Sequence, residues 1–214
     1  MVDLRTQYLH IREEVDRNIA EVIENTAFIN GPQVKAFASE LGTYLDGAEV
    51  IPCANGTDAL QIAMMALGLR PGDEIITASF TYVATAEAIA LLQLTPVLVD
   101  VDPETFALDP EQVRAAIGPR TRAIVPVHLF GQCAPMEPVM ELAREHNLYV
   151  IEDTAQAIGA RYLDRNGRSH HAGTMGDIGC TSFFPSKNLG CYGDGGALFT
   201  RKADLAERIR KVAN

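Results

Sequence analysis

The sequence predicts an α/β fold with a largely parallel sheet flanked by helices. Between Glu74 and Thr154, short β-rich runs alternate with helical stretches, and this alternation is typical of βαβ units whose sheet is buried on both faces. The strands expected in this region span residues 74–78, 96–101, 123–129 and 148–152. The helices expected between them span residues 84–94, 110–117 and 136–146. Further along the chain we expect strands at 178–184 and 196–200, followed by a charged helix from Lys202.

The segment before this region is predicted to be helical. Two helices are expected, at about residues 4–24 and 32–45, with a break at Asn30-Gly31-Pro32. Pro32 suits the first turn of the second helix, where its missing N–H is not needed. Pro126 is expected to interrupt the pairing of the third strand, because proline cannot donate to a sheet ladder. Since neither a repeat nor a linker is visible, we expect one α/β domain.

Composition narrows the classes of partner. The chain has 214 residues, of which 47% are hydrophobic and 21% charged, as in a globular protein with a sizeable core. Its formal net charge of −10 argues against nucleic acid or an anionic membrane as the main partner. The four cysteines show no CxxC spacing, which favours reduced thiols in a cytoplasmic protein over disulfides or a metal site. No signal peptide or membrane span is visible, and His170-His171 is predicted to lie in a polar loop.

Lys187 is the most informative residue of the sequence. It ends the apolar run Ser182-Phe183-Phe184-Pro185-Ser186-Lys187 and is followed by a glycine-rich stretch at 190–196. A lysine in this setting is a poor candidate for a solvated surface residue and a good candidate for an amine that forms a Schiff base. A lysine of that kind needs an acid for a ring nitrogen, a stacking aromatic ring and a phosphate cradle.

A candidate phosphate cradle lies at Asn55-Gly56-Thr57-Asp58, directly before the helical run at 59–67. Backbone N–H groups at a helix start point outwards at the positive end of the helix dipole, and they bind phosphate. The alternative is a plain N-cap by Asn55, Thr57 or Asp58. Ser182, five residues before Lys187, offers a hydroxyl to the same phosphate.

Asp153 and Gln156 follow an apolar strand, at the end of a parallel sheet where α/β folds bind ligands. Asp153 could keep a pyridine nitrogen protonated, and Gln156 could reach the neighbouring ring oxygen; a capping role for Asp153 is the alternative. Tyr82 lies just past another strand end, where a ring could stack on a flat cofactor, although a core or turn role is also open. Together these residues and Lys187 indicate a pyridoxal phosphate site.

The chain resembles the DegT-type nucleotide-sugar aminotransferases, which are pyridoxal phosphate enzymes with the aspartate aminotransferase fold. The resemblance lies in motifs spread over nearly the whole chain: Asp3-Leu4-Arg5-Thr6-Gln7, Gly31-Pro32, Pro71-Gly72-Asp73-Glu74, and residues 53–60, 80–85, 152–156 and 182–197. It implies that the chain forms the large domain of a fold-type-I transferase, with a mostly parallel sheet between helices.

The resemblance also implies roles for individual residues. Lys187 matches the Schiff-base lysine and Asp153 the partner of the pyridine nitrogen. The other expected cofactor contacts are Gln156 near the 3-hydroxyl, Tyr82 as the stacking ring, and Gly56, Thr57 and Ser182 in the phosphate cradle. Members of the family are longer and continue into a small C-terminal domain. Residues 1–214 are therefore expected to hold the N-terminal segment and the cofactor-binding domain without the small one.

The implied reaction moves an amino group, usually from glutamate, to a ketone of a nucleotide-linked sugar. The sequences of residues 53–61 and 185–196 resemble those of enzymes that aminate UDP-linked 3-keto N-acetylglucosaminuronate. Those enzymes serve cell-surface polysaccharide and lipopolysaccharide biosynthesis. Aminotransferases for 4-keto sugars or dTDP-linked 3-keto sugars are the alternatives, and so is a non-catalytic cofactor-binding fragment. A sugar 3-dehydratase is disfavoured, because those relatives carry histidine where Lys187 stands. The family also implies a homodimer.

Overall fold

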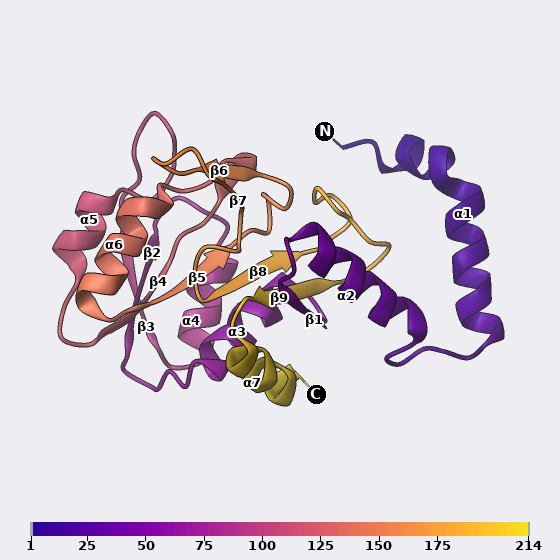
Figure 1. Ribbon diagram of the computed structural model, residues 1–214, viewed down its shortest axis with the longest axis horizontal. Coiled ribbons are helices and arrows are strands. Elements are labelled where there is room, and N and C mark those ends of the chain that lie inside the picture. Colours follow the sequence, from indigo (N-terminus) through magenta and orange to yellow (C-terminus); the bar gives the residue numbers. More distant parts are fainter. Residues whose placement is uncertain (1, 214) are drawn as a thin grey trace.

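Seven strands form one mixed sheet in the computed structural model, which describes residues 2–213 (Figure 1). In spatial order they are β1 (Glu49–Cys53), β9 (Gly196–Thr200), β8 (Ile178–Ser182), β5 (Tyr149–Asp153), β4 (Thr121–Val125), β2 (Glu74–Ala78) and β3 (Thr95–Val99). The pairs from β8 to β3 are parallel, whereas β9 runs antiparallel to both of its neighbours. The predicted α/β fold with a largely parallel sheet is therefore confirmed.

Helices cover both faces of the sheet. One face packs against α3 (Gly56–Ala66), α4 (Ala84–Leu91) and α7 (Ala203–Ala213). The other face packs against α5 (Pro110–Ala116) and α6 (Met136–His146). A third apolar cluster joins α2 (Pro32–Tyr44) to β1 and β9. The helix α1 (Leu4–Glu24) buries no residue and stands away from the sheet in Figure 1.

The central strands send consecutive side chains into opposite layers of the core. In β2, Ile75 packs in the layer with α3, whereas Ile76 packs in the layer with α6, and both are fully buried. In β5, Val150 belongs to the α6 layer and Ile151 to the α3 layer. This alternation explains why the strands read as unbroken apolar runs. It also means that the next two residues of β5, which are Glu152 and Asp153, face opposite sides.

Proline accounts for the main differences from the predicted strands. Strand β1 was not predicted, because Pro52 weakens its β pattern; the strand lies at an edge of the sheet, where proline is tolerated. Strand β4 ends at Val125 rather than 129, and pairing resumes beyond Pro126 only as the single bridge Val127–Asp153. The predictions for α1 and α6 match the structure residue for residue.

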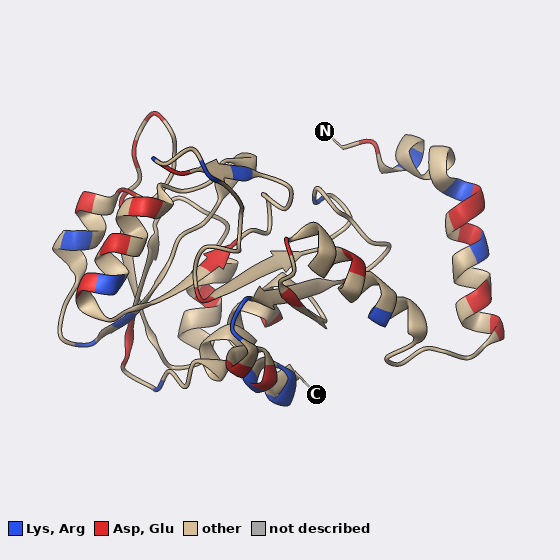
Figure 2. Ribbon diagram, in the orientation of Figure 1, with Lys and Arg blue, Asp and Glu red and all other residues tan. Residues whose placement is uncertain are grey.

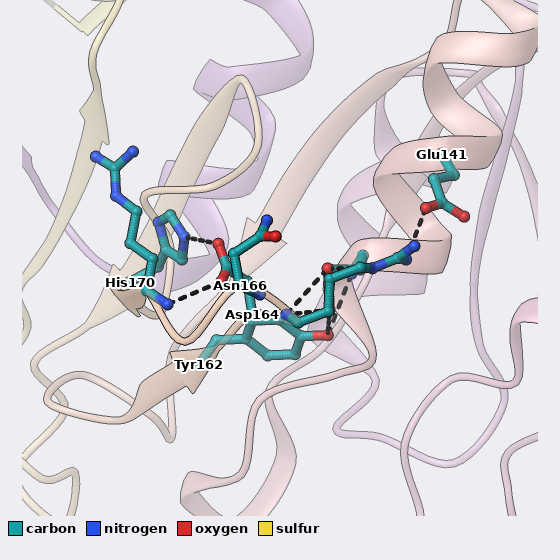
Figure 3. Close-up of polar contacts among 8 residues, drawn as sticks. Glu141, Tyr162, Asp164, Asn166 and His170 are labelled. Carbon is teal, nitrogen blue, oxygen red and sulfur yellow. Dashed lines mark hydrogen bonds and ion pairs between the residues drawn. The ribbon is translucent and has the colours of Figure 1, made fainter.

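A short antiparallel hairpin of β6 (Arg161–Leu163) and β7 (Ser169–His171) lies beside α6. Figure 3 shows the polar contacts that hold it there. The Arg165 side chain donates from Nε to Glu137 and from Nη2 to Glu141, each at 2.7 Å. The prediction that His170 and His171 lie in a loop is wrong, because both are paired residues of β7; the turn residues around them hid so short a strand.

His171 is buried with an exposed fraction of 1%, and neither ring nitrogen has a hydrogen-bond partner among the described residues. Its ring packs on that of Tyr44 with centroids 4.8 Å apart, and the nearest acid, Asp46, lies 3.8 Å from Nε2. Burial, together with the nearby charges of Arg161 and Arg201, lowers the pKa of His171, and Asp46 opposes this in part. The imidazole is therefore neutral in the folded protein near pH 7.

Acidic and basic residues are intermixed along α1, α5 and α6 in Figure 2.

Of the helices within residues 2–213, none combines the length and apolar character that crossing a membrane requires.

We predict that His171 makes the folded protein sensitive to mild acid. Below the ordinary histidine pKa of about 6.5 the unfolded chain takes up a proton that the buried His171 resists, so stability falls as the pH drops through that value. The His171→Phe variant keeps a flat ring against Tyr44 and should lose less unfolding free energy between pH 7.5 and pH 5.5. Urea denaturation at a series of pH values measures this. An equal acid sensitivity of wild type and His171→Phe would refute the prediction, and the exposed His10→Gln variant serves as control.

Candidate active site

A cavity of about 610 Å³ opens at the carboxyl ends of β5 and β8. Its lining includes all seven residues that the sequence singled out: Gly56, Thr57, Tyr82, Asp153, Gln156, Ser182 and Lys187. Asp153 and Ser182 are the last residues of their strands, and the carboxyl ends of parallel strands are where α/β sheets bind ligands. The fold thus brings together residues that lie up to 131 positions apart in the chain.

One wall of the cavity is the N-terminus of α3. Asn55 caps this helix, since its Oδ1 accepts from the Asp58 N–H at 2.8 Å. The capping role considered for Asn55 is therefore correct, and it leaves the N–H groups of Gly56 and Thr57 without a partner among residues 2–213. Two free donors at the positive end of a helix dipole suit a phosphate group.

Glycine is required where α3 meets the sheet. A Cβ on Gly56 would lie 2.7 Å from the Cβ of Ser182, and one on Gly196 would lie 2.4 Å from the backbone of Asn55. Neither position can carry a side chain, because the Ser182 Cβ and the Asn55 backbone cannot rotate away from an added Cβ. The close approach brings the free N–H groups of the helix beside the Ser182 hydroxyl.

The Asp153 carboxylate forms the floor of the cavity and is 8% exposed. Its Oδ2 accepts from the Thr85 hydroxyl at 2.8 Å, and its Oδ1 accepts from the Ala155 N–H at 3.1 Å. A carboxylate has about four acceptor positions, so two donors leave capacity for a further one from the cavity.

Glu152, on the opposite face of β5, is fully buried and accepts four hydrogen bonds. Its Oε2 accepts from His128 Nε2 and from the Gly173 N–H, both at 2.8 Å. Its Oε1 accepts from the N–H groups of Met175 at 2.7 Å and Gly176 at 2.5 Å. A group that accepts from four donors is an ionised carboxylate, and its buried charge is stabilised by these bonds.

His128 contacts both acids at the end of β5. Its Nδ1 accepts from the Ala134 N–H at 3.0 Å, so the proton of the neutral ring lies on Nε2 and points to Glu152. The backbone N–H of His128 donates to the Asp153 carbonyl at 2.9 Å. Both side chain and backbone of His128 therefore hold the end of β5 in place.

Gln156 and Tyr82 line the cavity from separate loops. The Gln156 Oε1 accepts from the Phe130 N–H at 3.0 Å, at a residue whose φ of 58° lies in the left-handed region. Since Oε1 is engaged, the Nε2 amide of Gln156 is the group left to donate into the cavity. Tyr82 is 70% exposed, so its ring is available to cover a flat ligand.

Lys187 lies in a turn closed by its N–H donating to the Phe184 carbonyl at 2.8 Å. The preceding Ser182 Oγ accepts from the Phe184 N–H at 3.2 Å, which tightens the start of this segment. The Lys187 side chain is half-buried, and its amine has neither a hydrogen bond nor an ion pair with the residues described. Asp194 lines the same cavity from the end of this glycine-rich stretch.

Thiol chemistry is not favoured near the cavity. Burial raises the pKa of Cys53 to about 12 and that of Cys133 to about 11. Both thiols are thus protonated near neutral pH, and the thiolate is the nucleophilic form. Within residues 2–213, no group of three or more His, Cys, Asp or Glu side chains is arranged to hold a metal ion.

Sequence reasoning missed Thr85, His128 and Asp194 as residues of this region. Thr85 belongs to the motif at residues 80–85, which the sequence analysis did single out. The spacing of residues along the chain does not show that its hydroxyl reaches Asp153, 68 residues away. His128 follows Pro126 at a strand end, which was a usable signal for a residue near the cavity.

The chain belongs to the DegT/DnrJ/EryC1/StrS aminotransferase family, whose profile matches residues 9–214. It is 50% identical to UDP-2-acetamido-2-deoxy-3-oxo-D-glucuronate aminotransferase from Pseudomonas aeruginosa, over 99% of this chain and 58% of the relative. It is 47% identical to UDP-N-acetyl-3-dehydro-alpha-D-glucosamine 3-aminotransferase from Acidithiobacillus ferrooxidans, over 100% of this chain and 57% of the relative. The chain thus spans somewhat more than half the length of these curated relatives.

Solved structures share the fold. DesV from S. venezuelae, in complex with a ketimine intermediate, has a TM-score of 0.92 and 43% identity over 97% of this chain and 55% of that one. NtdA from Bacillus subtilis, with bound cofactor PMP, has a TM-score of 0.84 and 38% identity over 92% of this chain and 43% of that one. The predicted family and the aspartate aminotransferase-like fold of type I are therefore confirmed.

We predict that the Glu152→Gln variant is strongly destabilised. The amide puts a donor where Oε1 or Oε2 now faces N–H groups, so at least one buried donor loses its acceptor. A loss of about 3 kcal/mol of unfolding free energy is expected. The exposed Glu104→Gln variant should stay within about 0.5 kcal/mol of wild type. Guanidinium denaturation measures both, and equal midpoints for the two variants would contradict the role given to Glu152.

Proposed function

We propose that this protein is a pyridoxal 5'-phosphate-dependent aminotransferase that acts on a keto group of a nucleotide-linked sugar. The observation that carries the proposal is the cavity in which an amine without a partner, that of Lys187, shares the lining with the buried carboxylate of Asp153. The known aminotransferase family and the PMP bound to NtdA support the choice of cofactor.

The groups around the cavity fit that cofactor. A phosphate suits the free N–H groups of Gly56 and Thr57 beside the Ser182 hydroxyl. A protonated ring nitrogen suits Asp153, and a ring oxygen suits the Nε2 amide of Gln156. The exposed Tyr82 ring offers a stacking face.

When bound, pyridoxal phosphate supplies an aldehyde that links to amines and a ring that draws electrons from the linked carbon. In the proposed reaction the Lys187 Nζ would hold the cofactor and would take up and return the substrate proton. General base catalysis of this kind contributes typically about 10²–10⁴-fold. Asp153 would keep the ring nitrogen protonated, so its loss should harm turnover more than binding.

The proposed acceptor is UDP-2-acetamido-2-deoxy-3-keto-glucuronate, and the proposed donor is L-glutamate. The 50% identity to the Pseudomonas aeruginosa enzyme supports the acceptor. Such an activity would serve the synthesis of cell-surface polysaccharide, including lipopolysaccharide. Because the matched relatives are longer, we propose that residues 1–214 supply the cofactor-binding domain of the site.

We further propose that the protein is a cytoplasmic homodimer. The four cysteines are free, as is usual in a reducing compartment. The helix α1 buries no side chain, and the loop after it exposes Phe28 and Ile29 to 66% and 87%, so this apolar surface is available to a second subunit. Sedimentation equilibrium should give twice the chain mass; a monomer at micromolar concentration would argue against the dimer.

We predict that the purified protein forms a covalent link with pyridoxal phosphate through Lys187. Addition of the cofactor should produce a visible absorption band, and borohydride should make the link permanent. Mass spectrometry of the digest should then find the cofactor on the peptide that contains Lys187. A folded Lys187→Ala variant should show neither band nor modified peptide, and its transamination rate should fall by at least about 10²-fold.

The Lys202→Ala variant is a suitable control, because Lys202 is exposed, pairs with Asp177 and does not line the cavity. Reduction of wild type that modifies other lysines and leaves Lys187 untouched would rule out the proposed function. A panel of keto-sugar nucleotides with glutamate then tests the acceptor.

A further inference from the structure

Thr85 makes an unusual use of its hydroxyl group. It lies in the first turn of α4, where threonine ordinarily bonds to the local backbone, yet its Oγ1 donates to Asp153 Oδ2 at 2.8 Å across 68 residues. The residue is 1% exposed, and the helix around it has the sequence Ala-Thr-Ala-Glu-Ala-Ile-Ala-Leu. A buried hydroxyl is favourable only with a partner, and here the partner is a carboxylate.

The helix itself has no need of this hydroxyl. The N-cap of α4 is Val83, which makes no side-chain capping bond, and within the described residues the Thr85 hydroxyl has no local acceptor. Alanine and leucine are better helix formers than threonine, so local helix propensity does not favour threonine here. The long-range bond to Asp153 is the interaction that accounts for this residue.

The bond from Thr85 fixes the orientation of the Asp153 carboxylate, which rotamer preferences alone do not fix. The carboxylate of an aspartate rotates over a broad range, because a torsion between sp³ and sp² atoms has shallow wells. At Asp153 each oxygen is held by one donor, Ala155 N–H on Oδ1 and Thr85 on Oδ2, and the donors come from separate segments. Two donors on two oxygens set the plane of the carboxylate, which lines the cavity and keeps acceptor capacity for a ligand.

We infer that Thr85 is a positioning residue that orients the Asp153 carboxylate toward the ring nitrogen of the cofactor, an inference that rests on the proposed function. Tyr82 lies three residues earlier on the same segment and lines the cavity. This short segment therefore provides both the stacking ring and the donor that sets the opposing acid. A shift of the segment would move both together.

The experiment compares Thr85→Val, which keeps the shape without the hydroxyl, with Thr85→Ser, which keeps the hydroxyl. Thr77→Val is the matched control, because Thr77 is equally buried and its Oγ1 donates to the Val125 carbonyl at 2.9 Å outside the cavity. The probe is pyridoxamine 5'-phosphate, which lacks an aldehyde and so reports contacts other than the link to Lys187. Calorimetric titration gives its dissociation constant.

Thr85→Val should raise the dissociation constant of pyridoxamine phosphate by about tenfold, as expected for the loss of one hydrogen bond to a charged group. Thr85→Ser and Thr77→Val should stay within about twofold of wild type, as expected where no such bond is lost. In an Asp153→Asn background, adding Thr85→Val should change the affinity by less than about twofold, since the hydroxyl acts through the carboxylate. With pyridoxal phosphate, the pH at which the visible band changes should be higher in Thr85→Val than in wild type. In Thr85→Ser it should equal the wild-type value.

Equal affinity and an unshifted band in Thr85→Val would overturn the inference while leaving the proposed function intact. A loss of the same size in the Asp153→Asn background would also overturn it, because Thr85 would then act by another route. Wild type that binds neither pyridoxal nor pyridoxamine phosphate would overturn the proposed function itself. Should Thr85→Val fail to fold by circular dichroism, Thr85→Ala, which also removes the hydroxyl, takes its place in every comparison.

Discussion

The buried carboxylate of Glu152 ties β5, the strand that also carries Asp153, to His128 and to the segment at residues 173–176. Four donors converge on it, from the His128 ring and from the N–H groups of Gly173, Met175 and Gly176, and the charge has no access to water. An unpaired charge in this position would be very unfavourable, so the folded state requires all of these segments to be in place together. A Cβ on Gly173 or Gly176 would collide with Phe199 or Val150, which is why a glycine-containing loop can approach so closely.

Two adjacent acids in β5 have opposite surroundings, and the pleat of the strand is the reason. Glu152 faces the α6 layer, where three backbone N–H groups and the His128 ring saturate it, whereas Asp153 faces the α3 layer and the cavity. A carboxylate saturated by the protein holds structure, and one with acceptor capacity left can bind a ligand. Because side chains alternate along a strand, one dipeptide serves the scaffold and the site without the two negative charges pointing the same way.

The features that could be predicted from the sequence are those that depend on short stretches of chain. The βαβ pattern indicated the parallel sheet, and local motifs indicated Lys187, Asp153 and the turn before α3. The pairs that complete the site are long-range, such as Thr85 with Asp153 and His128 with Glu152, and spacing along the chain carries no trace of them. Strand β1 was missed for a related reason: Pro52 looks like a strand breaker until the fold shows that the strand lies at an edge.

The same proline has a counterpart at the far side of the sheet. The two edge strands are β1 and β3, and they contain Pro52 and Pro96, respectively. An edge strand offers unpaired backbone groups to any other extended chain, and proline removes a donor from that row. Both edge strands of this seven-stranded sheet are thus poor templates for pairing with a strand of another chain. This protects an otherwise very apolar sheet from edge-to-edge aggregation.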